Sequence, residues 1–424
     1  MVPDSSYDVV IIGGGPAGCT AAAVLAMHGR RVIVLEKEKF PRYHVGESMM
    51  PYCYFPLERI GALDRVKNSH FIRKYSVQFV RQNGEVTQPF YFFQHYDHPS
   101  STTWQILRSE FDQILMDNAR EKGAEVLEET KVNEILWDGD RALGVRAVRK
   151  DGTELELRAP MTIDASGRDA LTIARRGWRV MDEKLRKIAI WTYYRGARRD
   201  SGYDEGATTV AYVPQKGWFW YIPLHEDVVS VGIVAERDYL FKGTRDLRTI
   251  FEREIRKNKW IEEHLAQGEQ FGKYFTTSEF SYRSRYCAAD GLVLAGDAFG
   301  FLDPVFSSGL FLALWGGVKV GDVVHAALNE GEVRAERFAE YGSEVCESME
   351  TMRKLVYAFY DRGFSFKKLI TAYPDVRPAL TDCLIGHLQR DFGDLVKGLG
   401  EFATLPEPTT YGHPLTEPLC ASSS

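Results

Sequence analysis

The chain has 424 residues and a formal net charge of −6, from 53 basic and 59 acidic side chains. Its length fits about two to three domains of ordinary size. The hydrophobic fraction of 44% and the charged fraction of 26% are typical of a globular protein with a large core, and they exclude a disordered chain. Because proteins that hold nucleic acid by bulk charge are strongly basic, this balance argues against a nucleic-acid partner.

The cysteines and the N-terminal segment bear on the cellular compartment. No two of the six cysteines form a C-x-x-C pair, so neither a zinc site nor a disulfide framework is expected, and we predict no bound metal. The N-terminal segment has no basic stretch followed by a long apolar one, and no window approaches about 18 uninterrupted apolar residues. We therefore expect a cytoplasmic protein without a membrane span. The cysteines are Cys19, Cys53, Cys287, Cys346, Cys383 and Cys420.

The first motif follows a short apolar run at residues 7–12 (YDVVII), which predicts a strand. An Ala-rich helix and a second strand (RRVIVLEKE) come after it. Gly13, Gly15 and Gly18 have the G-x-G-x-x-G spacing between strand and helix that is typical of dinucleotide binding. Gly13 makes the tight turn, Gly15 lets the backbone approach a pyrophosphate, and Gly18 lets the helix pack against the sheet. The helix N-terminus then faces the phosphates with its positive end.

Glu36 completes this motif at the end of the second strand, 18 residues after Gly18. A carboxylate at this place accepts hydrogen bonds from the hydroxyls of an adenosine ribose. The neighbouring Ala17 and Lys37 are also predicted to contact the cofactor. Only one such fingerprint is present, so the chain is predicted to hold one dinucleotide.

A second motif, GLVLAGDAFGFLDP at residues 291–304, resembles the second flavin motif of the FAD oxidoreductases related to p-hydroxybenzoate hydroxylase. In that family the residue matching Asp297 accepts a bond from the ribityl chain, and the following helix points at the flavin ring. Residues 164–167 (DASG) resemble the family's mid-chain return to the sheet. Arg108 matches a basic residue of that family that opens a helix beside the cofactor. The alternative interpretation is that Arg108 is a solvated charge at the start of a helix.

The resemblance implies an α/β (α+β) fold, with a Rossmann-like FAD-binding domain, an antiparallel-sheet substrate domain and a C-terminal helical region. Short β-rich runs between about 185 and 285 predict the sheet, which residues 70–100 are expected to join. Residues 309–329 predict a buried helix, and 332–400 a helical cap over the pocket. The expected division is 1–70, 100–184 and 285–330 for the FAD-binding domain, 71–99 and 185–284 for the substrate domain, and 331–424 for the cap and tail.

Two further segments narrow the chemistry. Gly46-Glu47-Ser48 resembles the flavin-facing loop that flavin-dependent halogenases share with geranylgeranyl reductases. Trp218 and Trp220, followed by Ile-Pro, match the W-x-W-x-I-P signature of the halogenases at all four specified positions. Two residues that are two apart on a strand project to the same face, where large rings would keep a substrate away from the flavin. The alternative is an aromatic pair that only stabilises the sheet.

Lys74 lies 27 residues after Glu47, on a predicted strand that enters the substrate domain. Halogenases carry a lysine at the matching place, so the resemblance implies that Lys74 binds hypohalous acid or is halogenated to a haloamine. Burial would lower the pKa of its amine and make the neutral, nucleophilic form accessible near pH 7. The alternative is an exposed strand lysine. Arg73 is directed to the opposite face by strand alternation.

The stretch DPVFSSG at residues 303–309 resembles the halogenase segment that holds halide with backbone N–H groups near Ser308 and Gly309. A helix N-terminus binds anions without a charged side chain. Pro304 and Phe306 are assigned to the substrate pocket. Free-tryptophan halogenases have a glutamate where this chain has Phe306, so the resemblance implies the branch that acts on phenols or carrier-bound substrates.

These motifs predict a halogenase that uses FADH2 and O2 to make hypohalous acid and delivers it through a lysine to an electron-rich aromatic compound of secondary metabolism. A separate flavin reductase would supply the reduced cofactor, the halide would be chloride or bromide, and the substrate would be free or tethered to a carrier protein. The alternatives are a flavin-dependent aromatic monooxygenase, an alkene reductase of the geranylgeranyl type and a non-catalytic redox-sensing flavoprotein. The predicted catalytic residues are Lys74, Trp218 and Trp220, and the predicted cofactor-binding residues are Gly13, Gly15, Ala17, Gly18, Glu36, Lys37, Gly46, Glu47, Ser48, Arg108, Asp297 and Gly309.

Overall fold

A six-stranded sheet forms the centre of the computed structural model, which describes residues 7–213, 217–278 and 281–416. Its strand order is β19-β20-β11-β1-β2-β7, and neighbouring strands are parallel except at β19. The inner strands are buried apolar runs because the sheet is covered on both faces. This is the Rossmann-like arrangement that the sequence predicted. The strands are β1 (Val9–Ile12), β2 (Val32–Leu35), β7 (Glu125–Leu127), β11 (Met161–Asp164), β19 (Ala288–Ala289) and β20 (Leu292–Leu294).

Two helices cross closely against this sheet, α1 (Pro16–Met27) and α9 (Ser308–Glu330). A Cβ atom at Gly317 would lie 2.8 Å from the carbonyl oxygen of Ala17, so only glycine allows this approach. By length and composition alone α9 would suffice to cross a membrane, but 61% of its most apolar window is buried inside the structure. Its contact with α1 makes it a core helix of the FAD-binding part.

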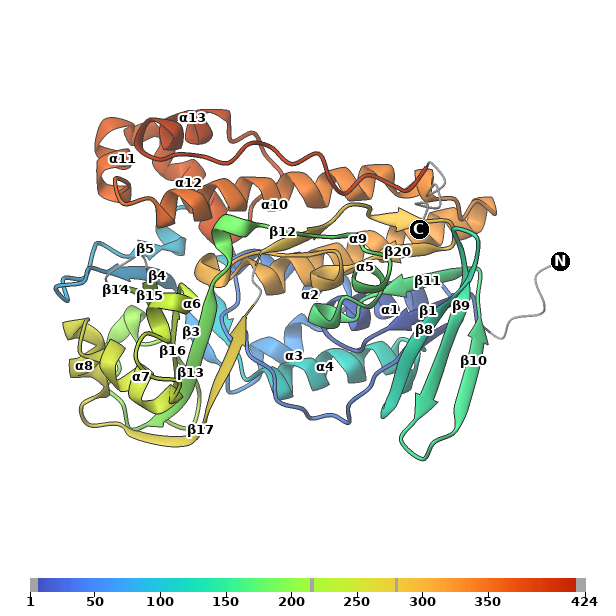
Figure 1. Ribbon diagram of the computed structural model, residues 1–424, viewed down its shortest axis with the longest axis horizontal. Coiled ribbons are helices and arrows are strands. Elements are labelled where there is room, and N and C mark those ends of the chain that lie inside the picture. The colour runs from blue at the N-terminus through green and yellow to red at the C-terminus, as the bar shows by residue number, and fades with distance from the viewer. Residues whose placement is uncertain (1–6, 214–216, 279–280, 417–424) are drawn as a thin grey trace.

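A seven-stranded sheet lies at one end of the molecule, in the order β17-β13-β16-β15-β14-β4-β5 (Figure 1). Its pairs are antiparallel, as predicted, except for the parallel pair of β14 and β4. The segment expected at 70–100 supplies β4 and β5. The strands are β4 (Ser76–Val80), β5 (Phe90–Tyr91), β13 (Ile188–Arg195), β14 (Thr208–Val213), β15 (Gly217–Pro223), β16 (Val228–Ala235) and β17 (Glu269–Ser278).

Three helices that the sequence did not predict cover the outer face of this sheet. They are α6 (Arg237–Leu240), α7 (Leu247–Ile255) and α8 (Lys259–Leu265). Phe219 and Tyr221 of β15 join the core beneath them, whereas Trp218 and Trp220 belong to the larger core on the other side. The strand is therefore buried on both faces, and its alternation fixes which rings face the centre of the molecule.

The C-terminal helices lie along one long side of the molecule (Figure 1). They are α10 (Ala339–Tyr360), α11 (Phe366–Ala372), α12 (Arg377–Ile385) and α13 (Gly393–Phe402). At the opposite end from the seven-stranded sheet lie β8 (Thr130–Asp138), β9 (Arg141–Arg149) and β10 (Glu154–Arg158). The smaller elements are α2 (Tyr54–Arg59), α3 (Leu63–Lys67), α4 (Arg108–Glu121), α5 (Leu171–Arg175), β3 (Ile72–Lys74), β6 (Thr103–Gln105), β12 (Arg179–Met181), β18 (Tyr282–Ser284) and β21 (Gly300–Phe301).

Five cysteines are free thiols, and Cys420 lies outside the described residues.

The crossing of α1 and α9 gives a stability prediction with an internal control. Gly317→Ala places a methyl group 2.8 Å from the backbone of α1, so we expect it to lower the free energy of unfolding by about 1–3 kcal/mol. The neighbouring Gly316→Ala meets only the Tyr341 hydroxyl, at 3.9 Å, and we expect it to be neutral or to stabilise the helix by about 1 kcal/mol. Urea unfolding of both variants tests this, and equal effects would contradict it.

Candidate active site

One cavity, of about 620 Å³, runs from the carboxyl ends of the parallel strands to the seven-stranded sheet. Open α/β sheets bind their ligands at this edge. The cavity brings together segments that are far apart in the sequence: the glycine turn, the loop at 40–51, residues 165–169 and 295–313, and strand β15. Of the predicted cofactor residues, Gly18 alone does not line it.

The glycine turn has the shape that a pyrophosphate requires. Gly13 has a φ of +97°, and a Cβ atom there would lie 2.5 Å from the carbonyl oxygen of Ala165. A Cβ atom at Gly18 would lie 2.0 Å from the carbonyl oxygen of Gly13. At Gly15 the nearest atom is 3.8 Å away, on Arg42, so this backbone faces open space. The helix α1 begins at the next residue, and its N-terminus faces the cavity.

Glu36 is held where a ribose would lie. Its Oε2 atom accepts a hydrogen bond from the N–H of Gly14 at 2.8 Å, and its Oε1 atom accepts one from the N–H of Glu38 at 2.8 Å. The side chain is buried and lines the cavity. Lys37 pairs with Asp169 across the cavity, and both residues line it. These groups, together with the open face of Gly15, fit the adenosine and pyrophosphate of FAD.

Arg108 anchors the loop that carries Glu47. Its guanidinium donates two hydrogen bonds to Asp112, at 2.8 and 3.0 Å, and a third to the carbonyl oxygen of Val45 at 3.0 Å. The side chain is 6% exposed, so it is not a solvated charge at a helix start. Asp297 faces the same cavity, and burial raises the pKa of its carboxyl to about 6.

Lys74 is buried directly behind the cavity wall. Its Nζ atom donates to the hydroxyl of Ser48 at 2.9 Å and to the carbonyl oxygen of Met49 at 3.1 Å. Ser48 lines the cavity and Lys74 does not. Burial lowers the pKa of the Lys74 amine to about 7. Arg73 is exposed, so the two side chains lie on opposite faces of β3.

The two indoles of β15 line the cavity side by side, with ring centroids 6.2 Å apart. The Nε1 atom of Trp218 donates to the hydroxyl of Tyr360 at 2.7 Å, and that hydroxyl donates to Asp303 at 2.8 Å. The Nε1 atom of Trp220 donates to the hydroxyl of Ser230 at 3.1 Å. Both rings are therefore fixed by polar partners as well as by packing.

Helix α9 begins at the cavity. Ser307 has a φ of +58°, and the helix starts with Ser308 and Gly309. The first N–H groups of a helix have no acceptor within the helix. Gly309 lines the cavity, while Ser308 is buried beside it. A Cβ atom at Gly309 would meet nothing closer than 3.8 Å, so this backbone is open to a small ligand.

Phe306 was assigned to the substrate pocket, and the structure places it behind the wall of the FAD cavity. It does not line the cavity, whereas Pro304 does. Its ring packs edge-on against Phe359 and Phe366, with centroids 5.8 and 6.4 Å apart. The described residues of α10–α13 do not line the cavity either. The C-terminal helices instead support the Trp218 wall from behind, through Phe359 and Tyr360.

Four polar residues of the site were missed from the sequence: Tyr43, Tyr193, Ser230 and Tyr360. The Tyr193 hydroxyl donates to Glu47 at 2.7 Å and lies 3.0 Å from the Tyr43 hydroxyl. Alternation along β13 was an available signal, because Tyr193 follows Trp191 by two residues and shares its face. Tyr43 precedes the Gly46-Glu47-Ser48 motif by three residues, but no spacing rule relates it, Ser230 or Tyr360 to the site, and only the folded chain brings them together.

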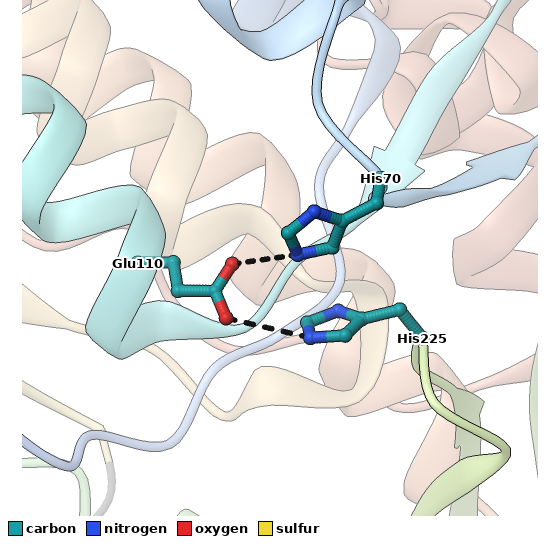
Figure 2. A group of neighbouring side chains, drawn as sticks. All are labelled: His70, Glu110 and His225. Carbon is teal, nitrogen blue, oxygen red and sulfur yellow. Dashed lines mark hydrogen bonds and ion pairs between the residues drawn. The ribbon is translucent and has the colours of Figure 1, made fainter.

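A polar cluster outside the cavity joins three segments (Figure 2). The Nε2 atom of His70 lies 2.9 Å from one oxygen of Glu110, and that of His225 lies 3.4 Å from the other. Two imidazoles and a carboxylate are ligands that zinc accepts. Here each imidazole already contacts its own carboxylate oxygen. The cluster therefore links the start of α4 to the segment before β3 and to the turn after β15.

Comparison with known proteins agrees with this geometry. Residues 6–353 match the family model described as an FAD binding domain. The chain is 32% identical over 361 residues to the flavin-dependent halogenase armH3 of Armillaria mellea, covering 80% of this chain and 71% of that protein. It is 27% identical to a 1H-pyrrole-2-carbonyl-[peptidyl-carrier protein] chlorinase of Pseudomonas fluorescens, covering 87% and 86%. The structure of the flavin-dependent brominase Bmp2 superimposes with a TM-score of 0.84 at 26% identity, covering 93% and 98%.

The chain is thus an FAD-dependent oxidoreductase. Within that class it belongs to the flavin-dependent halogenases.

The ribose-binding role of Glu36 predicts a loss of cofactor affinity. Glu36→Gln keeps an acceptor for the Gly14 N–H but removes the charge that strengthens hydrogen bonds to the ribose. We expect the Kd for oxidised FAD to rise about 10- to 100-fold, as measured by quenching of flavin fluorescence. Glu58→Gln on the exposed face of α2 is the control and should leave the Kd unchanged. An unchanged Kd for Glu36→Gln would contradict the assignment.

Proposed function

We propose that this enzyme oxidises halide at the FAD site and passes hypohalous acid to Lys74, which delivers it to an electron-rich aromatic substrate. The observation that carries the proposal is the buried amine of Lys74, hydrogen-bonded to a residue of the cavity wall. When bound and reduced, FAD supplies two of the four electrons that reduce O2, and the halide supplies the other two. The protein then positions the reactants, keeps water out of the path of the hypohalous acid and supplies the neutral amine of Lys74.

The chemistry of Lys74 follows from its surroundings. At pH values above about 7 its amine is neutral, with a lone pair available to an electrophilic halogen. In the neutral state it still has two N–H bonds for Ser48 and for the carbonyl oxygen of Met49. The amine therefore holds hypohalous acid by hydrogen bonding or forms a haloamine on its nitrogen. Either species reaches the substrate without contact between the substrate and FAD.

The indole pair argues against the monooxygenase alternative. An aromatic substrate must lie beside the flavin to be hydroxylated, but Trp218 and Trp220 occupy that side of the cavity. Both rings are fixed by hydrogen bonds, to Tyr360 and Ser230, so they do not swing aside freely. A small halide passes where an arene does not.

The start of α9 is the proposed halide site. Ser308 and Gly309 present backbone N–H groups at the positive end of a 23-residue helix. The cavity at this point is lined by Pro304, Val305 and Leu310, which exclude water and favour a weakly hydrated anion.

The proposed substrate is an electron-rich arene, either free or tethered to a carrier protein. The pyrrole chlorinase among the relatives acts, by its name, on a carrier-bound aromatic ring. The residue before Ser307 is Phe306 rather than an acid, which favours this branch over free tryptophan. The single dinucleotide fingerprint supports a separate flavin reductase as the source of the reduced cofactor.

Substitution of Lys74 separates halide oxidation from halogen delivery. Lys74→Met keeps the length of the side chain and removes the amine, so we expect arene halogenation to fall about 100-fold or more. Oxidation of reduced FAD by O2 should continue at the wild-type rate, because Lys74 does not line the FAD cavity. Product is measured by mass spectrometry with phenols and pyrroles as acceptors, and flavin oxidation by absorbance.

Arg73→Met is the matched control, since that side chain is exposed on the opposite face of the same strand. It should halogenate as the wild type does. Normal halogenation by Lys74→Met would remove the lysine from the mechanism.

A further inference from the structure

We propose that Glu47, Tyr193 and Tyr43 (the Glu47 relay) carry a proton from solvent into the FAD cavity. The inference rests on the proposed function, whose overall balance is ArH + X⁻ + FADH2 + O2 + H⁺ → ArX + FAD + 2 H2O. One proton is therefore taken up per turnover, in addition to the two hydrogens of the reduced cofactor. Glu47 is the group that donates this proton inside the cavity, and the two tyrosines restore it.

The hydrogen bonds of the relay have one consistent direction. The indole N–H of Trp191 donates to the Tyr43 oxygen at 2.6 Å, and an indole nitrogen can only donate. The hydrogen of Tyr43 is then directed to the Tyr193 oxygen, 3.0 Å away. The hydrogen of Tyr193 is directed to Oε1 of Glu47, 2.7 Å away. Every hydroxyl hydrogen thus points one step closer to Glu47, as inward proton transfer requires.

The two ends of the relay lie in different surroundings. Glu47 is 1% exposed and lines the FAD cavity. Tyr43 is 47% exposed and lies where this cavity meets a second, more open hollow lined by Lys37, Arg42 and Lys131. The ring of Phe275 stacks on Tyr43 at 4.5 Å and on Trp191 at 5.3 Å, which fixes the outer end.

The protonation states suit this direction. Burial raises the pKa of the Glu47 carboxyl to about 7, against the opposing effects of hydrogen bonds from Ser230 and Tyr193 and of the charge on Arg108. Burial also raises the pKa of Tyr43 to about 12, and that of Tyr193 further. At neutral pH the tyrosines keep their hydrogens while Glu47 exists as both acid and carboxylate.

The transfer conserves charge at each step. The acid form of Glu47 gives its O–H proton to the reacting oxygen in the cavity and becomes a carboxylate. The carboxylate takes the hydroxyl hydrogen of Tyr193, which takes that of Tyr43. Water at the surface reprotonates Tyr43. No tyrosine has to remain ionised, which agrees with their raised pKa values.

Kinetics of two substitutions test the relay. With FAD-loaded, reduced enzyme, bromide and O2, halide oxidation is followed by bromination of monochlorodimedone. Glu47→Gln keeps an acceptor for Tyr193 but has no acidic proton, and we expect halide oxidation to slow about 100-fold. Tyr193→Phe breaks the relay and should slow it about tenfold, with a larger rate decrease in D2O than the wild type shows. Tyr194→Phe, on the opposite face of β13, is the control and should match the wild type.

A second measurement does not depend on activity. In oxidised, FAD-loaded protein, infrared titration should show a protonated carboxyl that disappears around pH 7 in the wild type and is missing in Glu47→Gln. Because the native pKa is raised, the stability contributed by this carboxyl is present below its unfolded pKa of about 4.3 and is lost as pH rises through about 7. The Tm of the wild type should therefore fall more between pH 5 and pH 8 than that of Glu47→Gln.

The outcomes separate the relay from the proposed function. A wild type that consumes reduced FAD without oxidising bromide overturns the proposed function, and the relay with it. A wild type that oxidises bromide no faster than Glu47→Gln overturns the relay alone. A carboxyl that titrates at ordinary acidic pH also overturns it.

Discussion

The burial of β15 on both faces is the constraint on which the site depends. All seven residues of Gly217–Pro223 are buried, so neither face of the strand is exposed to solvent. Phe219 and Tyr221 are fixed by the core under α7 and α8. Because side chains alternate, Trp218 and Trp220 then have one possible direction, into the FAD cavity. The described residues of α6–α8 do not line the cavity, but the core beneath these helices fixes the direction in which the two indoles point.

A feature of the site could be predicted from the sequence where the residues that determine it are close together in the chain. The positions of the glycine turn, Glu36 and the two indoles are set by spacing along one strand or turn. The structure brings these segments to one cavity, and the roles of the residues stay predictions. Strand alternation predicted only that Lys74 and Arg73 lie on opposite faces, and the resemblance to halogenases pointed to Lys74 as the functional one. The packing of Phe306 could not be predicted from the sequence, because its ring lies against Phe359 and Phe366, whose positions depend on the C-terminal helices. No local pattern contains that information.

The missed polar residues have a common explanation. Tyr193, Ser230 and Tyr360 each satisfy a buried polar atom of a motif residue that the sequence did identify. A buried carboxyl or indole N–H without a partner costs about 1–3 kcal/mol, so a partner at these positions stabilises the fold. Sequence alone shows that a partner would be favourable and not which segment supplies it. The helices α6–α8 were not predicted because they are short and lie between two strands whose sequence patterns are much stronger.

The loop at 40–51 connects the two titratable groups of the proposed chemistry. Glu47 and Ser48 are adjacent in this loop. Glu47 accepts a hydrogen bond from Tyr193, and Ser48 accepts one from the Lys74 amine. Burial brings the pKa values of Glu47 and Lys74 together from opposite sides, to about 7 each. In the proposed roles Glu47 must be protonated and Lys74 neutral. These two states coexist best near pH 7, because the protonated fraction of Glu47 falls and the neutral fraction of Lys74 rises as the pH increases through that value.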